Sequence, residues 1–266
     1  MNTKKLNINF KKKGYVIIDL DKISINELST IQKKIKSSKI ENILDEKKFL
    51  KKSLHLQNSI YKKEFHKSIL KRNLNKILSI LGIKESNELN ITSFIHLRSV
   101  KKTNKNSKKN FIGLHRETFY SDFNYTKYQI NVTIPLLNYF PQNSMRVIEK
   151  SHKVPDYKIK TKKLTSEESG IKRFSLAHKL GMPYNPKIIL SGINLDKSKR
   201  VNLKTNQFMI FSGQLIHGNG NNFRDKIRLS IDFGLIKKIK LNGKKIKNHK
   251  HVSYSNSGKY WEKLKI

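Results

Sequence analysis

Hydrophobic positions in the first third of the chain follow two periodicities. Residues 14–20, GYVIIDL, form a short β-branched run followed by acidic and polar residues, which predicts a strand leading into a helix. We expect that helix to begin near Ser24, with Glu27 three residues later as in a capping box. Its apolar stripe consists of Ile31, Ile35 and Ile40. A second helical stretch is predicted over residues 59–81, where apolar side chains recur at helical spacing, and Gly82 is expected to end it.

From residue 91 onward the pattern changes to short apolar runs separated by turns. Residues 91–98 form the first run, and the lysine-rich insert at residues 101–110 is expected to be a loop or lid, since nothing in it can be buried cheaply. Further strands are predicted at residues 128–137, 144–148, 187–190, 207–211 and 227–236, and a last hairpin at Asn242-Gly243. Short strands without long intervening helices favour an antiparallel barrel or sandwich over a parallel α/β sheet.

Length and composition suit a single folded domain. The chain has 266 residues, 36% of them hydrophobic, and neither a repeat nor a convincing linker divides it. We predict one domain over residues 1–266, with a helical support region at about 1–90, a β core at about 91–236 and a basic extension at about 237–266. The N-terminus lacks the apolar segment of a signal peptide, and no run approaches the roughly 20 apolar residues of a membrane span, which predicts a cytoplasmic protein.

The absence of cysteine narrows the chemistry, and the high positive charge leaves two interpretations open. Without cysteine, disulfides, thiolate zinc sites and cysteine nucleophiles are excluded, so any metal must be held by imidazole and oxygen ligands. The formal net charge is +38, yet only eight of the 57 basic residues are arginine and the lysines are spread along the whole chain. The lysines either form a surface that binds a polyanion, centred on residues 101–109 and 237–250, or are abundant because of AT-rich coding drift.

One constellation of polar residues stands out from the apolar runs. In an extended segment His115 and Glu117 point to the same face, which supplies two possible metal ligands. His217 ends a later apolar run at a Gly/Asn-rich turn and is the best candidate for a third ligand. Arg228 and Ser230 lie in the next apolar run, where an arginine is costly to bury without an anionic partner. Two histidines and one carboxylate are the ligand set of non-haem Fe(II) oxygenases.

This pattern resembles the Fe(II)/2-oxoglutarate-dependent oxygenases, and specifically their phytanoyl-CoA dioxygenase-like group. Residues 14–18, GYVII, resemble the opening strand of that group. Residues 144–153, SMRVIEKSHK, resemble its strand that ends in a Pro-Gly-Ser-His-Lys segment, although Glu149-Lys150 stand in place of Pro-Gly. Residues 206–211, NQFMIF, resemble the strand that leads to its distal histidine. The group more often has aspartate where this chain has Glu117.

The resemblance implies a fold, a cofactor set and a reaction. The fold would be mainly β with flanking helices, built on a double-stranded β-helix core with a helical N-terminal region. His115, Glu117 and His217 would bind Fe(II), and Arg228, helped by Ser230, would bind the C5 carboxylate of 2-oxoglutarate. Further cosubstrate contacts are predicted from Asn131, Thr133 and Asn219. The enzyme would use O2 to hydroxylate a small molecule, for which an anionic or carrier-linked compound is one option, with release of succinate and CO2.

Alternatives to hydroxylation stay open, as do the roles of the other histidines. Desaturation or ring formation would use the same centre, and a non-catalytic β-barrel that binds nucleic acid or another polyanion through its lysines is the competing class of function. We interpret His96 as packed or substrate-facing, and His152 as a structural loop residue. The remaining histidines, His55, His66, His178, His249 and His251, are predicted to lie at the surface. The oligomeric state and the substrate are not indicated by the sequence.

Overall fold

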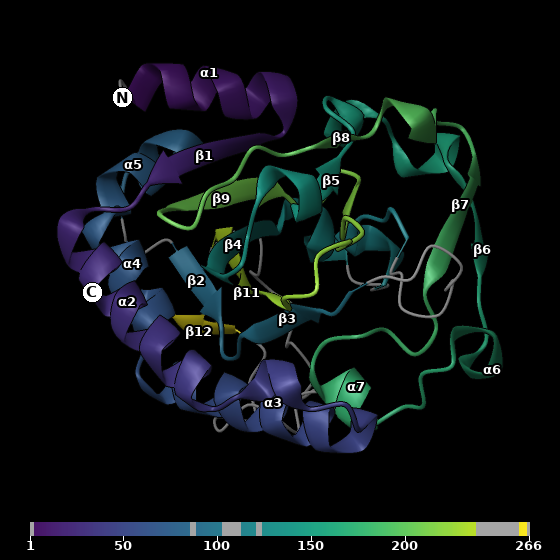
Figure 1. Ribbon diagram of the computed structural model, residues 1–266. Coiled ribbons are helices and arrows are strands. Elements are labelled where there is room, and N and C mark those ends of the chain that lie inside the picture. Colours follow the sequence, from purple (N-terminus) through teal and green to yellow (C-terminus); the bar gives the residue numbers. More distant parts are fainter. Residues whose placement is uncertain (1–2, 86–88, 103–112, 121–123, 238–260, 265–266) are drawn as a thin grey trace.

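Two antiparallel sheets form the centre of the molecule (Figure 1). The structure is a computed structural model and describes residues 3–85, 89–102, 113–120, 124–237 and 261–264. The larger sheet has the order β1 (Tyr15–Asp19), β9 (Gln207–Ser212), β4 (Ile130–Leu137), β11 (Arg228–Lys237), β2 (Leu89–Thr92) and β12 (Trp261–Lys263), and β3 (His96–Val100) also pairs with β11. The smaller sheet has the order β10 (His217–Gly218), β5 (Arg146–Val147) and β8 (Lys199–Arg200), and β6 (Lys160–Lys163) pairs with β7 (Lys187–Ser191) as a separate ribbon.

The two faces of the larger sheet differ in polarity. In β11 the side chains of Leu229, Ile231, Phe233 and Leu235 belong to the main apolar core, which is shared with the N-terminal helices. The alternate positions, Arg228, Ser230 and Asp232, point to the opposite face because side chains alternate along a strand. A second apolar cluster, which includes Met209 and Phe211 of β9 and Val147 of β5, fills space between the two sheets. The polar positions of β11 therefore face the interior between the sheets, where a site can form.

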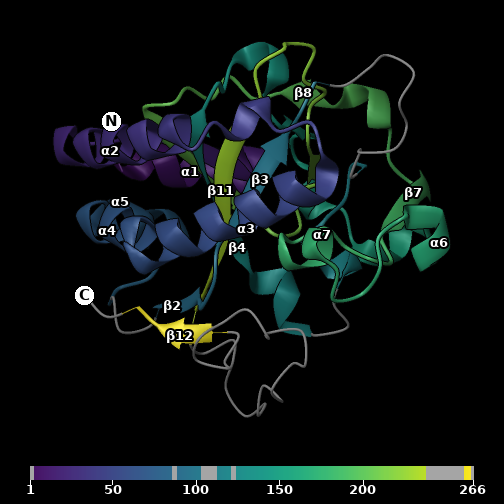
Figure 2. The same ribbon diagram turned by 60° about the horizontal axis from the view of Figure 1, so that its bottom comes forward.

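Five helices precede the β core and cover the apolar face of the larger sheet (Figures 1 and 2). They are α1 (Thr3–Lys13), α2 (Lys22–Ser37), α3 (Glu46–Lys62), α4 (Phe65–Arg72) and α5 (Leu74–Leu81). Two short helices, α6 (Ser166–Ser169) and α7 (Leu176–Lys179), follow later, and α6 lies with β6 and β7 at the end remote from α1 and α5 in both views. None of the described helices combines the length and hydrophobicity that a membrane span requires. The predicted β core with a helical N-terminal region is confirmed.

Helix boundaries differ from the prediction in three places. The first predicted helix begins at Lys22 and not near Ser24, because the Asp21 carboxylate is the N-cap and accepts from the backbone N–H of Ser24. The stretch predicted as one helix is three, interrupted at Glu64, which adopts a left-handed conformation with φ of 50°, and at Asn73. Gly82 ends α5 in a left-handed conformation with φ of 60°, as expected. The polar helix α1 was not predicted at all.

Most strands lie where the periodicity predicted them. The run at residues 91–98 is two strands, because the chain turns between β2 and β3 at residues 93–95. Most of the lysine-rich insert and the Asn242-Gly243 turn lie outside the described residues. The short 3-10 helices are Ile40–Asn42, Glu117–Phe119, Asn124–Tyr128, Pro141–Asn143, Ser151–Lys153, Asp156–Lys158 and Leu195–Lys197. The structure thus adds short helical turns to a β core that the sequence pattern outlines.

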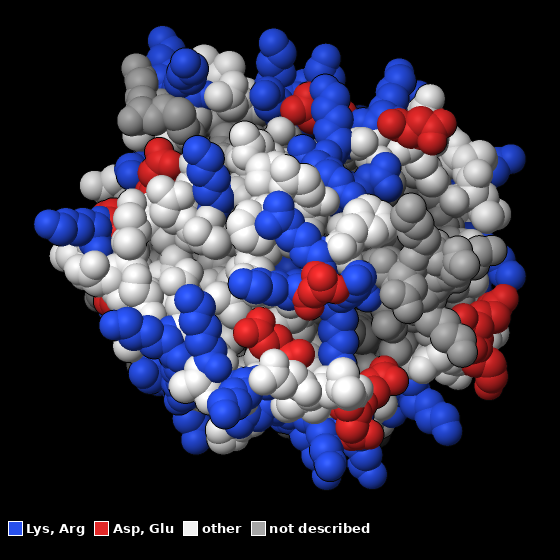
Figure 3. All heavy atoms as spheres, in the orientation of Figure 1, with Lys and Arg blue, Asp and Glu red and all other residues white. Residues whose placement is uncertain are grey.

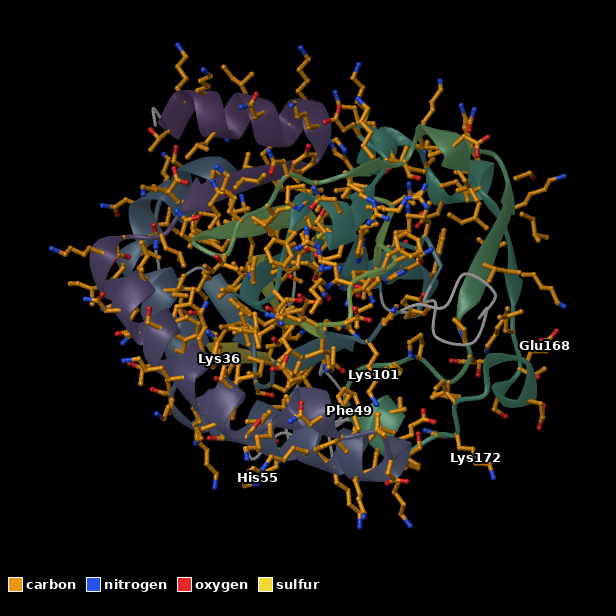
Figure 4. The ribbon with its side chains drawn as sticks, viewed as in Figure 1. Lys36, Phe49, His55, Lys101, Glu168 and Lys172 are labelled. Carbon is orange, nitrogen blue, oxygen red and sulfur yellow. The ribbon has the colours of Figure 1, made fainter. Side chains whose placement is uncertain are left out.

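Two histidines predicted to lie at the surface are buried. His66 is fully buried in α4, where its ring stacks on Tyr61 and meets the edge of Phe233 at centroid distances of 5.4 and 5.5 Å. His178 is also buried, and its Nδ1 accepts from the backbone N–H of Phe174. The prediction was wrong for both because each side chain lies on the inward side of its helix, in α4 among several polar residues and in α7 within four residues. His55 does lie on the outer side of α3 (Figure 4).

Burial of His66 should make the fold acid-sensitive. Burial, followed by the nearby charge of Lys67, lowers the pKa of His66 from 6.5 to about 3. The unfolded chain takes up this proton near pH 6.5 whereas the folded protein does so only near pH 3, so stability is lost as the pH falls through that window. We expect His66→Leu to remove about 2 kcal/mol of the stability difference between pH 7 and pH 5. Urea unfolding at both pH values measures this, with His55→Leu as an exposed control that leaves the difference unchanged.

Candidate metal centre

Backbone pairing, and not a regular strand, brings the three predicted ligands together. His115 and His217 form an isolated antiparallel bridge in which each backbone N–H donates to the other's carbonyl at 2.8 Å. Arg116 is extended, with φ of −131° and ψ of 159°, and the N–H of Glu117 donates to the carbonyl of Gly213 at 2.8 Å. His115 and Glu117 therefore face the same side as predicted, although a 3-10 helix begins at Glu117 where a continuous strand was expected.

The side chains of His115, Glu117 and His217 converge to ligand distances. One potential ligand atom from each of these residues lies within 4.8 Å of the other two, and His217 Nε2 is 3.6 Å from Glu117 Oε1. The two imidazole centroids are 4.4 Å apart. Both histidines are largely buried, whereas 26% of the Glu117 side chain is exposed. Among these three described side chains, the carboxylate is the most accessible.

Hydrogen bonds to carbonyl oxygens determine which nitrogen of each imidazole is free. His115 Nδ1 donates to the carbonyl of Gly113 at 2.9 Å, and His217 Nδ1 donates to that of Leu215 at 2.8 Å. A carbonyl can only accept, so the proton sits on Nδ1 and the Nε2 lone pair points away from it. Burial lowers the pKa of both histidines, and so both rings are neutral near pH 7. Neutral imidazoles with a free Nε2 and an anchored Nδ1 are suited to metal binding.

Neighbouring aromatic rings hold the two imidazoles in place. The ring of Tyr120 lies 4.9 Å from that of His115, and the ring of Phe211 meets His217 edge-on at 4.7 Å. Burial, followed by the Glu117 charge, raises the pKa of Tyr120, so the phenol stays protonated. These contacts limit rotation of the imidazoles and keep water away from their faces.

The carboxylate is oriented by an amide pair and by a missing side chain. Asn131 Nδ2 donates to Glu117 Oε1 at 2.8 Å, and Gln129 Nε2 donates to Asn131 Oδ1 at 2.8 Å. A Cβ at Gly213 would lie 3.3 Å from the Glu117 Cγ and 2.9 Å from the carbonyl oxygen of Gln129. Asn131 was predicted to contact a cosubstrate, and in the structure it positions a predicted metal ligand.

Loss of this amide should weaken metal binding without removing a ligand. In Asn131→Ala, Glu117 loses the donor that holds Oε1, and we expect divalent metal affinity to fall by about 10- to 100-fold. Titration of the purified variant with Co(II), followed by its visible absorption, measures the affinity. Asn206→Ala changes an exposed asparagine and should match the unchanged protein. Wild-type affinity in Asn131→Ala would show that Glu117 does not depend on the amide.

Arg228 differs from the other interior arginines in its partners. It is 1% exposed, it donates to the carbonyl of Asn143 and, at 2.7 Å, to Asn219 Oδ1, and its Nε is buried without a hydrogen-bond partner. Arg116 and Arg98 instead form ion pairs with carboxylates of Asp156 and Asp232. Within the described part of the chain, no carboxylate forms an ion pair with Arg228. A buried cation held only by neutral acceptors is costly unless an anion joins it.

The other residues predicted to contact a cosubstrate, Ser230, Asn219 and Thr133, differ in their partners. Ser230 is buried two residues after Arg228 on the same face of β11. Asn219 holds the guanidinium of Arg228, and Thr133 donates its hydroxyl to Asp232. A direct contact of any of the three with a cosubstrate stays a prediction. The sequence reasoning missed Asp232, although polar residues at 228, 230 and 232 of an apolar run were a signal for one polar strand face.

By sequence, the chain matches no protein-family model and no curated protein. By structure, it is similar to several solved non-haem enzymes. EvdO2 from Micromonospora carbonacea var. aurantiaca, complexed with 2-oxoglutarate, is 9% identical with a TM-score of 0.56, and the match covers 88% of this chain and 90% of EvdO2. The non-haem monooxygenase ThoJ in its apo form is 13% identical with a TM-score of 0.52, over 87% and 77% of the two chains. The 2-oxoglutarate-dependent carbocyclase SnoK from nogalamycin biosynthesis is 12% identical with a TM-score of 0.50, over 88% and 83%. At these identities the likeness shows the fold.

Proposed function

We propose that the protein is an Fe(II)- and 2-oxoglutarate-dependent oxygenase that acts on a small molecule. The observation that carries this proposal is the convergence of His115, Glu117 and His217, in which both imidazole Nε2 atoms are free. The same β core buries Arg228, which has no ion-pair partner among the described residues. We further propose that residues 1–266 form one oxygenase domain. The narrower resemblance to the phytanoyl-CoA dioxygenase-like group stays a prediction.

The donor set fits ferrous iron. Two neutral imidazoles and one carboxylate suit a divalent first-row metal, and three ligands on one side leave the remaining positions to other molecules. The chain contains no cysteine, so a softer thiolate site is not available. Second contacts to Gly113, Leu215 and Asn131 support each of the three ligands, as expected for a metal site and not for three polar residues that happen to meet.

The dicarboxylate 2-oxoglutarate fits the environment of Arg228. The guanidinium would bind the C5 carboxylate in a charge-assisted contact and so satisfy the buried Nε and the positive charge together. Asn143 and Asn219 hold the guanidinium in place before the ligand arrives. Similar solved proteins support the assignment, since EvdO2 was crystallised with 2-oxoglutarate and SnoK is named for its dependence on it.

The chain's own residues position the reaction and do not supply its oxidising power. Iron, 2-oxoglutarate and O2 would together supply the oxidation, with succinate and CO2 as the products of the cosubstrate. The neutral imidazoles and Glu117 hold the metal, the Tyr120 and Phe211 rings shield the imidazoles, and Arg228 orients the cosubstrate. Because Glu117 supplies a carboxylate ligand, no position is freed for a halide, so we favour hydroxylation over halogenation. Ring formation stays open, since SnoK is named a carbocyclase.

The competing polyanion-binding function gains no support from the visible surface. Lys and Arg side chains lie in several small groups over the face in Figure 3, separated by acidic and uncharged side chains, and do not form one continuous patch there. Lys101, the first lysine of the predicted strip, has its ammonium 3.9 Å from the Phe49 ring centroid beside α3 (Figure 4). Most other lysines of the two predicted strips lie outside the described residues.

Binding of 2-oxoglutarate is the direct test of the proposed function. The purified protein, loaded with Fe(II) under anaerobic conditions, is titrated with 2-oxoglutarate while heat of binding and visible charge-transfer absorption are followed. We expect saturable binding of one equivalent, and absorption that glutarate, which lacks the keto oxygen, does not produce. Admission of O2 should then yield succinate, slowly if the true substrate is absent. A metal-loaded protein that binds no 2-oxoglutarate would rule out the enzymatic function.

A further inference from the structure

A charged pair lies inside the β core and has no part in the proposed metal or cosubstrate binding. Arg98 of β3 is in register with Ser230 of β11 and reaches diagonally to Asp232, with Arg98 Nε 3.0 Å from Asp232 Oδ2. Both side chains are partly accessible, at 22% and 26%. Asp232 is also the one residue between Arg228 and Ile236 of β11 that is not buried. Both side chains are therefore accessible enough to contact a ligand.

The pair lies on the same face and at the same level as the metal centre. Asp232 is in register with Thr133 of β4, whose hydroxyl donates to it, and Thr133 is two residues from Asn131, which donates to Glu117. Positions two apart on one strand are separated by about 7 Å and share a face. A molecule held beside the metal would thus meet Arg98 and Asp232.

Each partner keeps hydrogen-bonding capacity for a ligand. Arg98 donates through Nη1 to the carbonyl of Gly181 at 2.8 Å, and its Nη2 has no hydrogen-bond partner among the residues that the structure describes. Asp232 accepts from Thr133 and Arg98 and retains a lone pair on each oxygen. The pair therefore offers a donor and an acceptor side by side, fixed by the backbone of Gly181 and the hydroxyl of Thr133.

Charges in the loaded site would cancel. Among the described residues of the inner face and metal centre, Arg98 and Arg228 carry positive charge, and Glu117 and Asp232 carry negative charge. Doubly charged ferrous iron would be matched by doubly charged 2-oxoglutarate. No uncompensated cation then remains beside the metal for an anionic substrate, and a further buried anion would be costly. The surface lysines behind the earlier expectation of an anionic substrate do not change this local balance.

We propose that Arg98 and Asp232 bind the polar group of the substrate next to the metal and select a group without net charge, either a neutral donor–acceptor group or a zwitterion. This inference rests on the proposed function, whose metal and cosubstrate sites define where the substrate lies. Arg98 donates to the substrate's acceptor, and Asp232 accepts from its donor. A substrate with an anionic group at this position is rejected, because it would face Asp232.

Neutralising one partner should convert the pair into an ion-binding site. The probe is acetate, added at constant ionic strength to the anaerobic Fe(II)/2-oxoglutarate complex while its charge-transfer absorption is recorded. We expect no saturable change in the wild-type protein. In Asp232→Asn the guanidinium of Arg98 is uncompensated, so acetate should give a saturable shift of the absorption. Its half-saturating concentration should be lower, by about tenfold or more, than that of any shift seen in the wild type. The double variant Arg98→Met/Asp232→Asn should lose the shift.

Two further variants separate substrate recognition from a structural ion pair. Asp156→Asn frees Arg116, a buried arginine whose partners lie at residues 151–156 and not beside the metal, and it should give no acetate response. Arg98→Met leaves Asp232 uncompensated, so methylammonium should shift the absorption in this variant and not in the wild type. This mirror variant decides the matter if Asp232→Asn fails to fold or to bind 2-oxoglutarate.

The results that overturn the inference differ from those that overturn the function. If wild-type protein binds no 2-oxoglutarate, the proposed function fails. If 2-oxoglutarate binds normally, the inference is overturned by acetate binding to wild type as tightly as to Asp232→Asn. It is equally overturned if Asp232→Asn and Arg98→Met respond to neither probe, since the pair would then be a structural link between β3 and β11 that the substrate does not reach.

Discussion

Replacing His217 by alanine should reduce divalent metal affinity by more than about 100-fold. Removing a metal ligand should cost more than removing a residue that only hydrogen-bonds to a ligand, which costs about 10- to 100-fold. The imidazole contributes the Nε2 that lies 3.6 Å from the Glu117 carboxylate, whereas its backbone bonds to His115 do not depend on the side chain. The fold should therefore persist while metal-dependent 2-oxoglutarate binding and succinate formation are lost. Co(II) titration and anaerobic 2-oxoglutarate titration measure the two effects.

The same loss is expected for His115→Ala, and a matched control exists. His55 is an exposed histidine of α3, so His55→Ala should retain wild-type metal affinity. Circular dichroism confirms that each variant is folded. Metal affinity within about tenfold of wild type in both His115→Ala and His217→Ala would disprove the assignment of this cluster as the metal centre.

Arg228→Met should separate cosubstrate binding from metal binding. The guanidinium is 1% exposed and has no carboxylate partner among the described residues, so we expect a bound dicarboxylate to depend on it. Truncating one side of a buried charge-assisted pair costs about 2–5 kcal/mol, which corresponds to a roughly 30-fold or larger loss of 2-oxoglutarate affinity. Metal affinity should stay unchanged, because the variant touches none of the three ligands. Calorimetric titration of the metal-loaded variant measures the change.

An exposed arginine provides the comparison for this experiment. Arg224 lies over the Phe140 ring at 4.2 Å and is exposed, so Arg224→Met should bind 2-oxoglutarate like the wild type. Unchanged affinity in Arg228→Met would remove Arg228 from the cosubstrate site. Arg98, the remaining arginine on the inner face, would then become the candidate anchor.

The shared side of His115 and Glu117 could be predicted because it depends on a local rule. An extended residue between His115 and Glu117 places both on one side, and this holds although the segment turns into a 3-10 helix directly afterwards. The pairing with His217 is a long-range contact that no periodicity shows, so the sequence could offer His217 only as a candidate ligand, which the family resemblance then supported. The amide of Asn131 that orients Glu117 could not be assigned for the same reason.

Burial of individual polar residues was the least predictable feature. His66 and Arg116 occupy polar stretches of sequence, yet both are fully buried, because the packing of distant elements decides which side of a short element faces inward. The break at Glu64 was equally hidden, since glutamate has no preference for the left-handed conformation that it adopts between α3 and α4. In contrast, the apolar run at residues 227–236 predicted the place of β11, which the structure has at Arg228–Lys237.

The absence of a side chain at Gly213 leaves room for the side chain of Glu117, which lies almost 100 residues earlier in the chain. Its space admits the extra methylene of Glu117, and a Cβ there would also meet the carbonyl of Gln129 at 2.9 Å. Exchanging Glu117 for aspartate alone would withdraw the carboxylate from Asn131, and enlarging Gly213 alone would displace it. A glutamate at position 117 therefore requires a glycine at position 213, so the reach of one residue depends on the size of the other.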